Sequence, residues 1–224
     1  MKLVIDIGST LIHNSLNPVA YLCELLDLPE CYKPLIRECM FGSVYENIIQ
    51  ITNSIHHSLY NPLSLPSILV EEDLVFEAIK IVWNNQMDES YILTGARNFI
   101  NTLHSLNIDR MYLSNIWPPF FEFFVHAFPT EARMPMLLSF QTGKMKPNLD
   151  LFFQVKRTYA SSDFVMIGDS YFNDIYPALA TGMKAVWLND GTNQPVIDAI
   201  DRGEFPRPTI IASTLEDVNI GQGL

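Results

Sequence analysis

The chain begins MKLVIDIGSTLIHN (residues 1–14), and the acid in this stretch decides how the rest of the sequence is interpreted. The apolar run of residues 3–5 has the composition of a buried strand, yet Asp6 follows it almost at once, with Gly and Ser close behind. A carboxylate at the end of a buried strand is either a residue that caps a turn or a functional group. Other segments of the chain are needed to decide between them.

Five more short apolar runs are spread along the chain and complete a set of six predicted strands. None of them alternates with polar residues, which is typical of strands that are covered on both faces. Helical patterns separate most of them, so the sequence predicts an α/β fold with a doubly wound parallel sheet. These runs are RMYLS (110–114), MLLSF (136–140), FVMIG (164–168), KAVWL (184–188) and TIIAS (209–213).

Residues 15–88 interrupt this alternation and contain no convincing strand. Their apolar residues recur at helical spacing, and Pro-containing joints separate the helical windows. We therefore predict about four helices inserted after the first strand and its loop. The expected domains are an α/β core formed by residues 1–14 and 89–224, and a helical cap domain formed by residues 15–88. The windows are PVAYLCELLDL (18–28), PLIRECMFGSV (34–44), YENIIQITNSIHHSLY (45–60) and EEDLVFEAIKIVWNNQM (71–87).

The composition excludes several classes of protein. The 224 residues are 48% apolar and only 17% charged, so we expect a sizeable core and no disorder. A net charge of −11 argues against nucleic acid or an anionic membrane as a partner. The three cysteines show no metal-binding spacing, and no apolar run approaches the ~20 residues of a membrane helix. We expect a cytoplasmic protein with reduced thiols, either a monomer or a homodimer.

Polar residues follow four of the predicted strands. In an open parallel sheet, ligands bind beyond the carboxyl ends of the strands, so these residues should meet at one edge. Crowded carboxylates repel one another unless a cation lies among them, and oxygen ligands suit Mg²⁺. A carboxylate can also attack a phosphoryl group while a lysine and a hydroxyl hold the charged oxygens. The residues are Asp6, Ser114, Asn115, Lys144, Lys146, Asp169 and Asp174.

Four segments in order carry a family resemblance. Each consists of a predicted strand end or loop with its polar residues, and any one of them alone is a weak signal. Together they resemble the four motifs of the haloacid dehalogenase (HAD) superfamily of hydrolases, in a member with a helical cap between the first and second motifs. The segments are VIDIGSTL (4–11), MYLSN (111–115), GKMKPNLDLF (143–152) and IGDSYFNDIYPALATGM (167–183).

The resemblance implies a role for each matching residue. Asp6 resembles the nucleophile, Ser114 the phosphate-binding hydroxyl and Lys146 the lysine that neutralises charge. Mg²⁺ is implied as cofactor, with Asp169 as a ligand and Asp174 as an acid that supports the ligands.

The resemblance also implies further contacts in the loops that follow the first two strands. The backbone carbonyl of Gly8 is expected to complete the metal ligands together with Asp6. The remaining phosphate-binding positions are Gly8, Ser9, Thr10 and Asn115.

Gly8 is a departure from the family pattern, which usually has a second Asp there as general acid and base. Such a group is typically worth ~100- to 10,000-fold in rate. Three interpretations stay open: relatives with Gly here are active, the substrate has a good leaving group such as an acyl phosphate or sugar 1-phosphate, or another side chain substitutes. His13 is the nearest candidate for such a substitute. Arg37 in the helical segment is a candidate contact for an anionic substrate, although an exposed helix arginine needs no such role.

The leading hypothesis is a Mg²⁺-dependent phosphatase that acts on a small phosphorylated metabolite. A metal-free haloacid dehalogenase is the first alternative, and Asp169 argues against it because those enzymes generally have Ser at that position. A phosphate-binding protein on a weakened enzyme scaffold is the second alternative, and Gly8 is its motivation.

Overall fold

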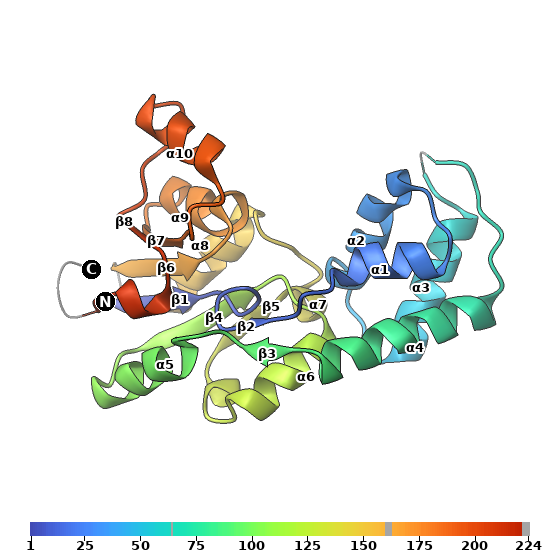
Figure 1. Ribbon diagram of the computed structural model, residues 1–224, viewed down its shortest axis with the longest axis horizontal. Helices are drawn as coiled ribbons and strands as arrows, with labels where there is room; N and C mark the ends of the chain where they lie inside the picture. Colours follow the sequence, from blue (N-terminus) through green and yellow to red (C-terminus); the bar gives the residue numbers. More distant parts are fainter. Residues whose placement is uncertain (64, 160–162, 221–224) are drawn as a thin grey trace.

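The computed structural model describes residues 1–63, 65–159 and 163–220. Its centre is a six-stranded parallel sheet in the order β5-β4-β1-β6-β7-β8, which confirms the predicted fold class (Figure 1). Two predictions were too long: the run MLLSF is strand only as far as residue 138 and then turns into a short helix, and TIIAS is strand only over residues 210–212. The strands are β1 (Lys2–Ile5), β4 (Arg110–Ser114), β5 (Met136–Leu138), β6 (Phe164–Gly168), β7 (Lys184–Leu188) and β8 (Ile210–Ala212).

Both faces of the sheet are covered, which explains why its strands are continuously apolar. Along β1, Leu3 and Ile5 belong to one buried cluster and Val4 belongs to the other. Alternate residues of a strand point to opposite faces, so one strand supplies both cores. The helices of the α/β core are α5 (Ala96–Ser105), α6 (Pro118–Ala127), α7 (Ser139–Thr142), α8 (Leu149–Thr158), α9 (Tyr176–Ala180) and α10 (Gln194–Asp201).

Residues 15–88 form what we call the helical insert, a group of helices that lies to one side of the sheet (Figure 1). A pair of short antiparallel strands, absent from the sequence-based expectations, leads into and out of it: β2 (Ile12–His13) pairs with β3 (Tyr91–Ile92). The helices are α1 (Pro18–Leu25), α2 (Lys33–Phe41), α3 (Ile48–Tyr60) and α4 (Glu72–Asp88), with a short 3₁₀ turn, η1 (Glu30–Tyr32).

Helix α4 connects the insert to the core by packing against α6. Trp83 on α4 meets Trp117, just before α6, in an edge-to-face contact with ring centroids 5.5 Å apart. The indole N–H of Trp117 donates to Gln86 Oε1 at 3.1 Å, so a buried amide and a buried indole satisfy each other. These contacts hold the insert beside the carboxyl edge of the sheet.

Local signals explain where several helices begin and end. The side chain of Asn148 accepts a hydrogen bond from the Asp150 amide at the start of α8, as an N-cap does. Gly182 follows α9 with φ of +75°, a conformation that glycine adopts without strain. Among the described residues, no helix combines the length and the apolar composition needed to cross a bilayer. The thiols of Cys23, Cys31 and Cys39 are free.

Candidate active site

Asp6 stands at the centre of the carboxyl edge of the sheet. Its backbone N–H donates to the Ile167 carbonyl at 3.0 Å, so the residue directly after β1 is still held by β6. The residue is only 6% exposed, and it lines a cavity of about 360 Å³. A buried carboxylate needs a partner, because an isolated charge is costly away from water.

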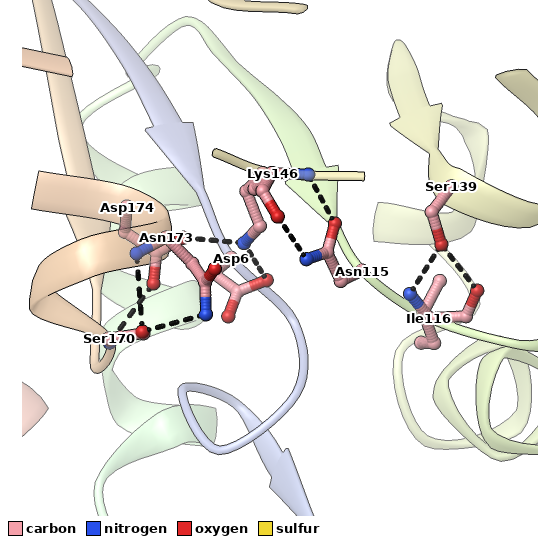
Figure 2. A network of polar contacts seen from close by, with 8 residues as sticks. All are labelled: Asp6, Asn115, Ile116, Ser139, Lys146, Ser170, Asn173 and Asp174. Atoms are coloured by element: carbon pink, nitrogen blue, oxygen red, sulfur yellow. Dashed lines mark hydrogen bonds and ion pairs between the residues drawn. The ribbon is translucent and has the colours of Figure 1, made fainter. Parts of the chain in front are cut away.

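Lys146 is that partner, and its ammonium lies between two acids (Figure 2). The Nζ atom is 2.8 Å from Asp6 Oδ1, and it donates a hydrogen bond to Asp174 Oδ1. Burial lowers the pKa of the lysine, but the charges of Asp174 and Asp6 raise it by more than burial lowers it. The pKa of Lys146 therefore lies above its ordinary value. The side chain therefore remains a cation. Lys144, two residues earlier, is exposed and pairs with Asp150.

Asn115 fixes the backbone of Lys146. Its Nδ2 donates to the Lys146 carbonyl at 2.9 Å, and its Oδ1 accepts from the Lys146 N–H at 2.7 Å (Figure 2). The predicted phosphate-binding residue Asn115 thus lines the cavity with its amide engaged in positioning the lysine. The next residue, Ile116, is held by Ser139, whose Oγ accepts a hydrogen bond from the Ile116 N–H and donates one to the Ile116 carbonyl.

Asp169 and Asp174 follow β6, in the loop and in the π-helical turn η3 (Tyr171–Ile175). Asp174 is fully buried, and its Oδ2 accepts from the Ser170 N–H at 3.1 Å. Both of its oxygens are therefore engaged, which fits an acid that orients Lys146. A Cβ on Gly168 would lie 2.5 Å from Asp174 Oδ2, so only glycine permits this close approach at the end of β6.

One ligand atom from each of Asp6, Asp169 and Asp174 lies within 4.8 Å of the others. Burial raises the pKa of Asp169 to about 8, and the neighbouring Asp6 and Asp174 add to the rise. Burial also raises the pKa of Asp174 to about 7, against the opposing effect of Lys146. Three carboxylates face one ammonium, so the cluster has an excess of negative charge. A hard divalent cation such as Mg²⁺ fits this donor set.

The predicted hydroxyl ligands differ in how closely they approach the cavity. Gly8 and Ser9 line it together with Asp6. Ser114 ends β4 and is 2% exposed, and its Oγ has no hydrogen-bond partner among the described residues, although the residue lies outside the cavity wall. Thr10 is fully buried, also with an unpartnered hydroxyl, and lines a neighbouring cavity instead. The structure therefore places all nine predicted site residues in or beside one region.

The β2–β3 strand pair and the helical insert also contribute residues to the wall of the cavity around Asp6. His13 Nδ1 is 3.2 Å from Ser9 Oγ, and the imidazole lines the cavity. Arg37 on α2 also lines it, with its guanidinium 5.7 Å from the ring centroid of Phe41. Both residues were candidates from the sequence, and both face the same cavity as Asp6.

Several lining residues were missed by the sequence analysis, among them Ser170, Asn173 and Phe120. Ser170 and Asn173 belong to the segment GDSYFND and form their own pair, with Ser170 Oγ accepting from Asn173 Nδ2 at 2.9 Å. Their place in that segment was a usable signal. Phe120 on α6 carried no signal, yet its Cε1 atom lies 3.2 Å from where a Cβ on Gly8 would be. An aromatic ring thus crowds the space in front of Gly8.

Solved structures with similar folds cover nearly the whole chain. A predicted phosphoglycolate phosphatase from Haemophilus somnus is 16% identical, with a TM-score of 0.60, over 96% of this chain and 94% of the other. A 2-haloacid dehalogenase from Pseudomonas syringae pv. tomato has the same identity and coverage, with a TM-score of 0.61. A Bacillus subtilis protein described as the HAD-hydrolase YfnB, solved bound to magnesium, is 17% identical, covers 96% of this chain and 95% of the other, and has a TM-score of 0.57.

At these identities the likeness is one of fold. Residues 144–218 also match the family model described as HAD-hydrolase-like. That segment is therefore similar to haloacid dehalogenase-like hydrolases, and the chain as a whole shares the fold of solved HAD hydrolases. A search of curated protein sequences gives no match. Gly8, the position at which the sequence departs from the pattern it resembles, lies beside Phe120 in the structure.

Proposed function

We propose that this chain is a Mg²⁺-dependent phosphatase that hydrolyses a small phosphorylated metabolite with Asp6 as its nucleophile. The observation that supports this most strongly is the arrangement of Asp6, Asp169 and Asp174 around the buried Lys146. This set supplies a nucleophilic oxygen, a fixed cation and an excess of negative charge that a divalent cation would balance.

In the proposed first step, an Asp6 oxygen attacks the phosphorus atom while the bond from phosphorus to the leaving oxygen breaks. Lys146 stabilises the charge on the phosphoryl oxygens, and Asp174 holds the ammonium in place. Water then attacks the phosphorus of the aspartyl-phosphate, which releases phosphate and restores the Asp6 carboxylate.

Asp6, Asp169 and the Gly8 carbonyl would hold Mg²⁺. When bound, the ion supplies positive charge to the transferring phosphoryl group. The donor set is suited to it because Mg²⁺ usually takes one or two carboxylates and completes its shell with water and phosphate oxygens. Asp174 is the less suitable ligand, since both of its oxygens already accept hydrogen bonds.

The leaving group must depart without a carboxylic acid at position 8. A weakly basic leaving oxygen needs little protonation, so acyl phosphates and sugar 1-phosphates are favoured substrates. We propose that the helical insert acts as a cap over the cavity and excludes water and bulky esters. Arg37 would then face the substrate from the cap side.

A screen of phosphorylated metabolites with purified protein and Mg²⁺ tests the proposal, with Asp6→Asn as the control. We expect turnover that chelation of the metal by EDTA abolishes. Turnover no higher than that of Asp6→Asn on every ester would contradict the proposal and favour a phosphate-binding role. Chloride release from 2-chloropropionate in EDTA would instead favour a dehalogenase, which similar folds include.

A further inference from the structure

A second cavity of about 480 Å³ adjoins the first one at the same edge of the sheet. Its walls are the loops that follow β7 and β8, together with the β2–β3 strand pair. Ser9, His13 and Asp169 line both cavities, so the two meet at the candidate metal ligand Asp169. A ligand in the second cavity would therefore lie next to the phosphoryl site.

The walls of the second cavity are rich in neutral polar groups. No Lys or Arg lines it among the described residues, which leaves a second phosphate or a carboxylate without a cationic partner. Hydroxyls and amides that both donate and accept hydrogen bonds dominate instead. They belong to Thr94, Asn189, Thr192, Asn193, Ser213 and Thr214.

Two buried donors on this wall are unpartnered. Asn189 is 6% exposed, and its Nδ2 has no hydrogen-bond partner in the described part of the chain, although its Oδ1 accepts from Asn193 at 3.3 Å. Thr10 is fully buried, and its Oγ1 likewise has no partner there. Buried polar groups are nearly always satisfied, so an unpartnered pair on one cavity wall points to a ligand that accepts hydrogen bonds.

The charged and aromatic groups of the wall narrow the class of ligand. Hydrogen bonds from Thr192 lower the pKa of Asp190, so this carboxylate is available as an acceptor for hydroxyl donors. Tyr91 is 46% exposed and lines the cavity, so its ring is available for contact with carbon-bound hydrogens. In the first cavity, by contrast, Arg37 provides a cation for an anionic tail.

We propose that the second cavity binds a neutral polyhydroxylated group, that of a sugar or a polyol. The group is either the organic part of the phosphate ester hydrolysed at Asp6 or a free sugar bound next to it. The first of these sources rests on the proposed function, whereas the second does not.

Binding is tested on the full chain by ligand-observed NMR with unphosphorylated ribose and sorbitol as probes. Ser213→Trp fills the cavity from an exposed position, and Thr192→Val removes one hydroxyl from another. The control is Asp198→Asn, which changes an exposed carboxylate on α10 outside both cavities. We expect saturation transfer to a probe with the wild type and the control, and its loss with Ser213→Trp. No transfer to either probe, or transfer unaffected by Ser213→Trp, would overturn the proposal.

Turnover distinguishes the two sources. The esters are the sugar 1-phosphates ribose 1-phosphate and glucose 1-phosphate, with acetyl phosphate as a substrate too small to reach the cavity. If the sugar is part of the substrate, Ser213→Trp lowers kcat/KM for the sugar esters roughly tenfold more than for acetyl phosphate. If the sugar binds separately, Ser213→Trp leaves the ratio of kcat/KM for the sugar esters to that for acetyl phosphate unchanged while the NMR signal is still lost, which supports the cavity assignment alone.

The remaining outcomes separate this proposal from the proposed function. Turnover of acetyl phosphate without probe binding leaves the phosphatase standing and rejects the sugar site. Probe binding without turnover of any ester rejects the phosphatase and keeps the sugar site. A preference for ethanolamine phosphate that Asp190→Asn abolishes would show a cavity for amines and would overturn the proposal.

Discussion

Two groups of buried charges among the described residues differ in how far their charges are compensated. Near the start of β4, Glu131 accepts from Arg110 Nε at 2.5 Å and from Arg110 Nη2 at 2.6 Å. Tyr112 donates to the same carboxylate, and His104 Nε2 lies 2.6 Å from it. We call these four residues the structural cluster. One carboxylate there has three partners, so its charge is compensated.

At the carboxyl edge of the sheet the proportions are reversed. Asp6, Asp169 and Asp174, here called the acidic cluster, share one buried lysine and leave unpartnered hydroxyls nearby. The pKa of Glu131 is lowered, because Arg110 and Tyr112 outweigh the effect of burial, whereas the pKa values of Asp169 and Asp174 are raised. Similar side chains are thus paired with cationic and hydroxyl partners in the structural cluster, whereas in the acidic cluster three carboxylates share one lysine.

Removing the nucleophile should have the largest effect. Asp6→Asn keeps the size of the side chain but lacks the nucleophilic carboxylate, so we expect turnover to fall at least about 1000-fold. Steady-state kinetics on the best ester from the screen measures this, with Asp198→Asn as the matched control. Residual activity within tenfold of the wild type would contradict a nucleophilic role.

Breaking the structural cluster should affect stability instead. Glu131→Gln leaves the Arg110 charge buried without its counter-ion, which typically costs about 3–5 kcal/mol in the free energy of unfolding. We expect Tm to fall by roughly 10 °C in thermal denaturation, while kcat of the folded protein changes little. An unchanged Tm would show that the cluster is not structural.

Restoring the missing acid should have a smaller effect, and only when space is made for it. Gly8→Asp alone places a Cβ 3.2 Å from Phe120, so we expect no gain in turnover. Gly8→Asp combined with Phe120→Ala should speed hydrolysis of esters with poor leaving groups by up to about 100-fold, the lower end for general acid catalysis. Acyl phosphates serve as the control, since they need little protonation. An equal gain from Gly8→Asp alone would contradict the role given to the ring.

The two clusters should also differ, by a smaller effect, in how the free energy of unfolding depends on pH. The pKa values of Asp169 (about 8) and Asp174 (about 7) lie above those of the unfolded chain, so the folded protein binds more protons at intermediate pH. Without metal, the free energy of unfolding should therefore decrease as pH rises from 5 to 8, with a fall in Tm on the order of 5 °C.

Glu131 behaves in the opposite sense, because its pKa is lowered in the fold. Its contribution is fully present above the unfolded pKa and is lost as pH falls through the folded value. Thermal scans of the wild type and Asp169→Asn in EDTA separate the two. The variant should show a flatter profile between pH 5 and 8, and an identical slope would contradict the assignment.

The sequence predicted what depends on local pattern. The six strands were visible because each is a short apolar run, and the polar residues at their carboxyl ends followed from parallel topology. Lys146, which the resemblance implied as the charge-neutralising lysine, lies beside Asp6 in the structure, whereas Lys144 is exposed. The β2–β3 strand pair was missed because two residues per strand are too few to show alternation of apolar and polar residues.

Contacts between distant segments were out of reach. Phe120 comes from α6 and meets Gly8 only through the packing of the fold. Asn115 was predicted to contact phosphate, but its two hydrogen bonds to the backbone of Lys146, 31 residues further along the chain, could not be predicted from local sequence. Arg110 and Glu131 each look ordinary in sequence, and nothing local shows that they pair.

We propose that a divalent cation balances the charge of the acidic cluster and that the structural cluster needs none. Thermal denaturation of the metal-free protein with increasing Mg²⁺ tests it most directly. We predict that Tm of the wild type and of Glu131→Gln rises by at least about 5 °C at Mg²⁺ concentrations near 100 times Kd, and that Asp169→Asn shows no rise. A wild-type Tm independent of Mg²⁺, or an equal rise in Asp169→Asn, would contradict the account.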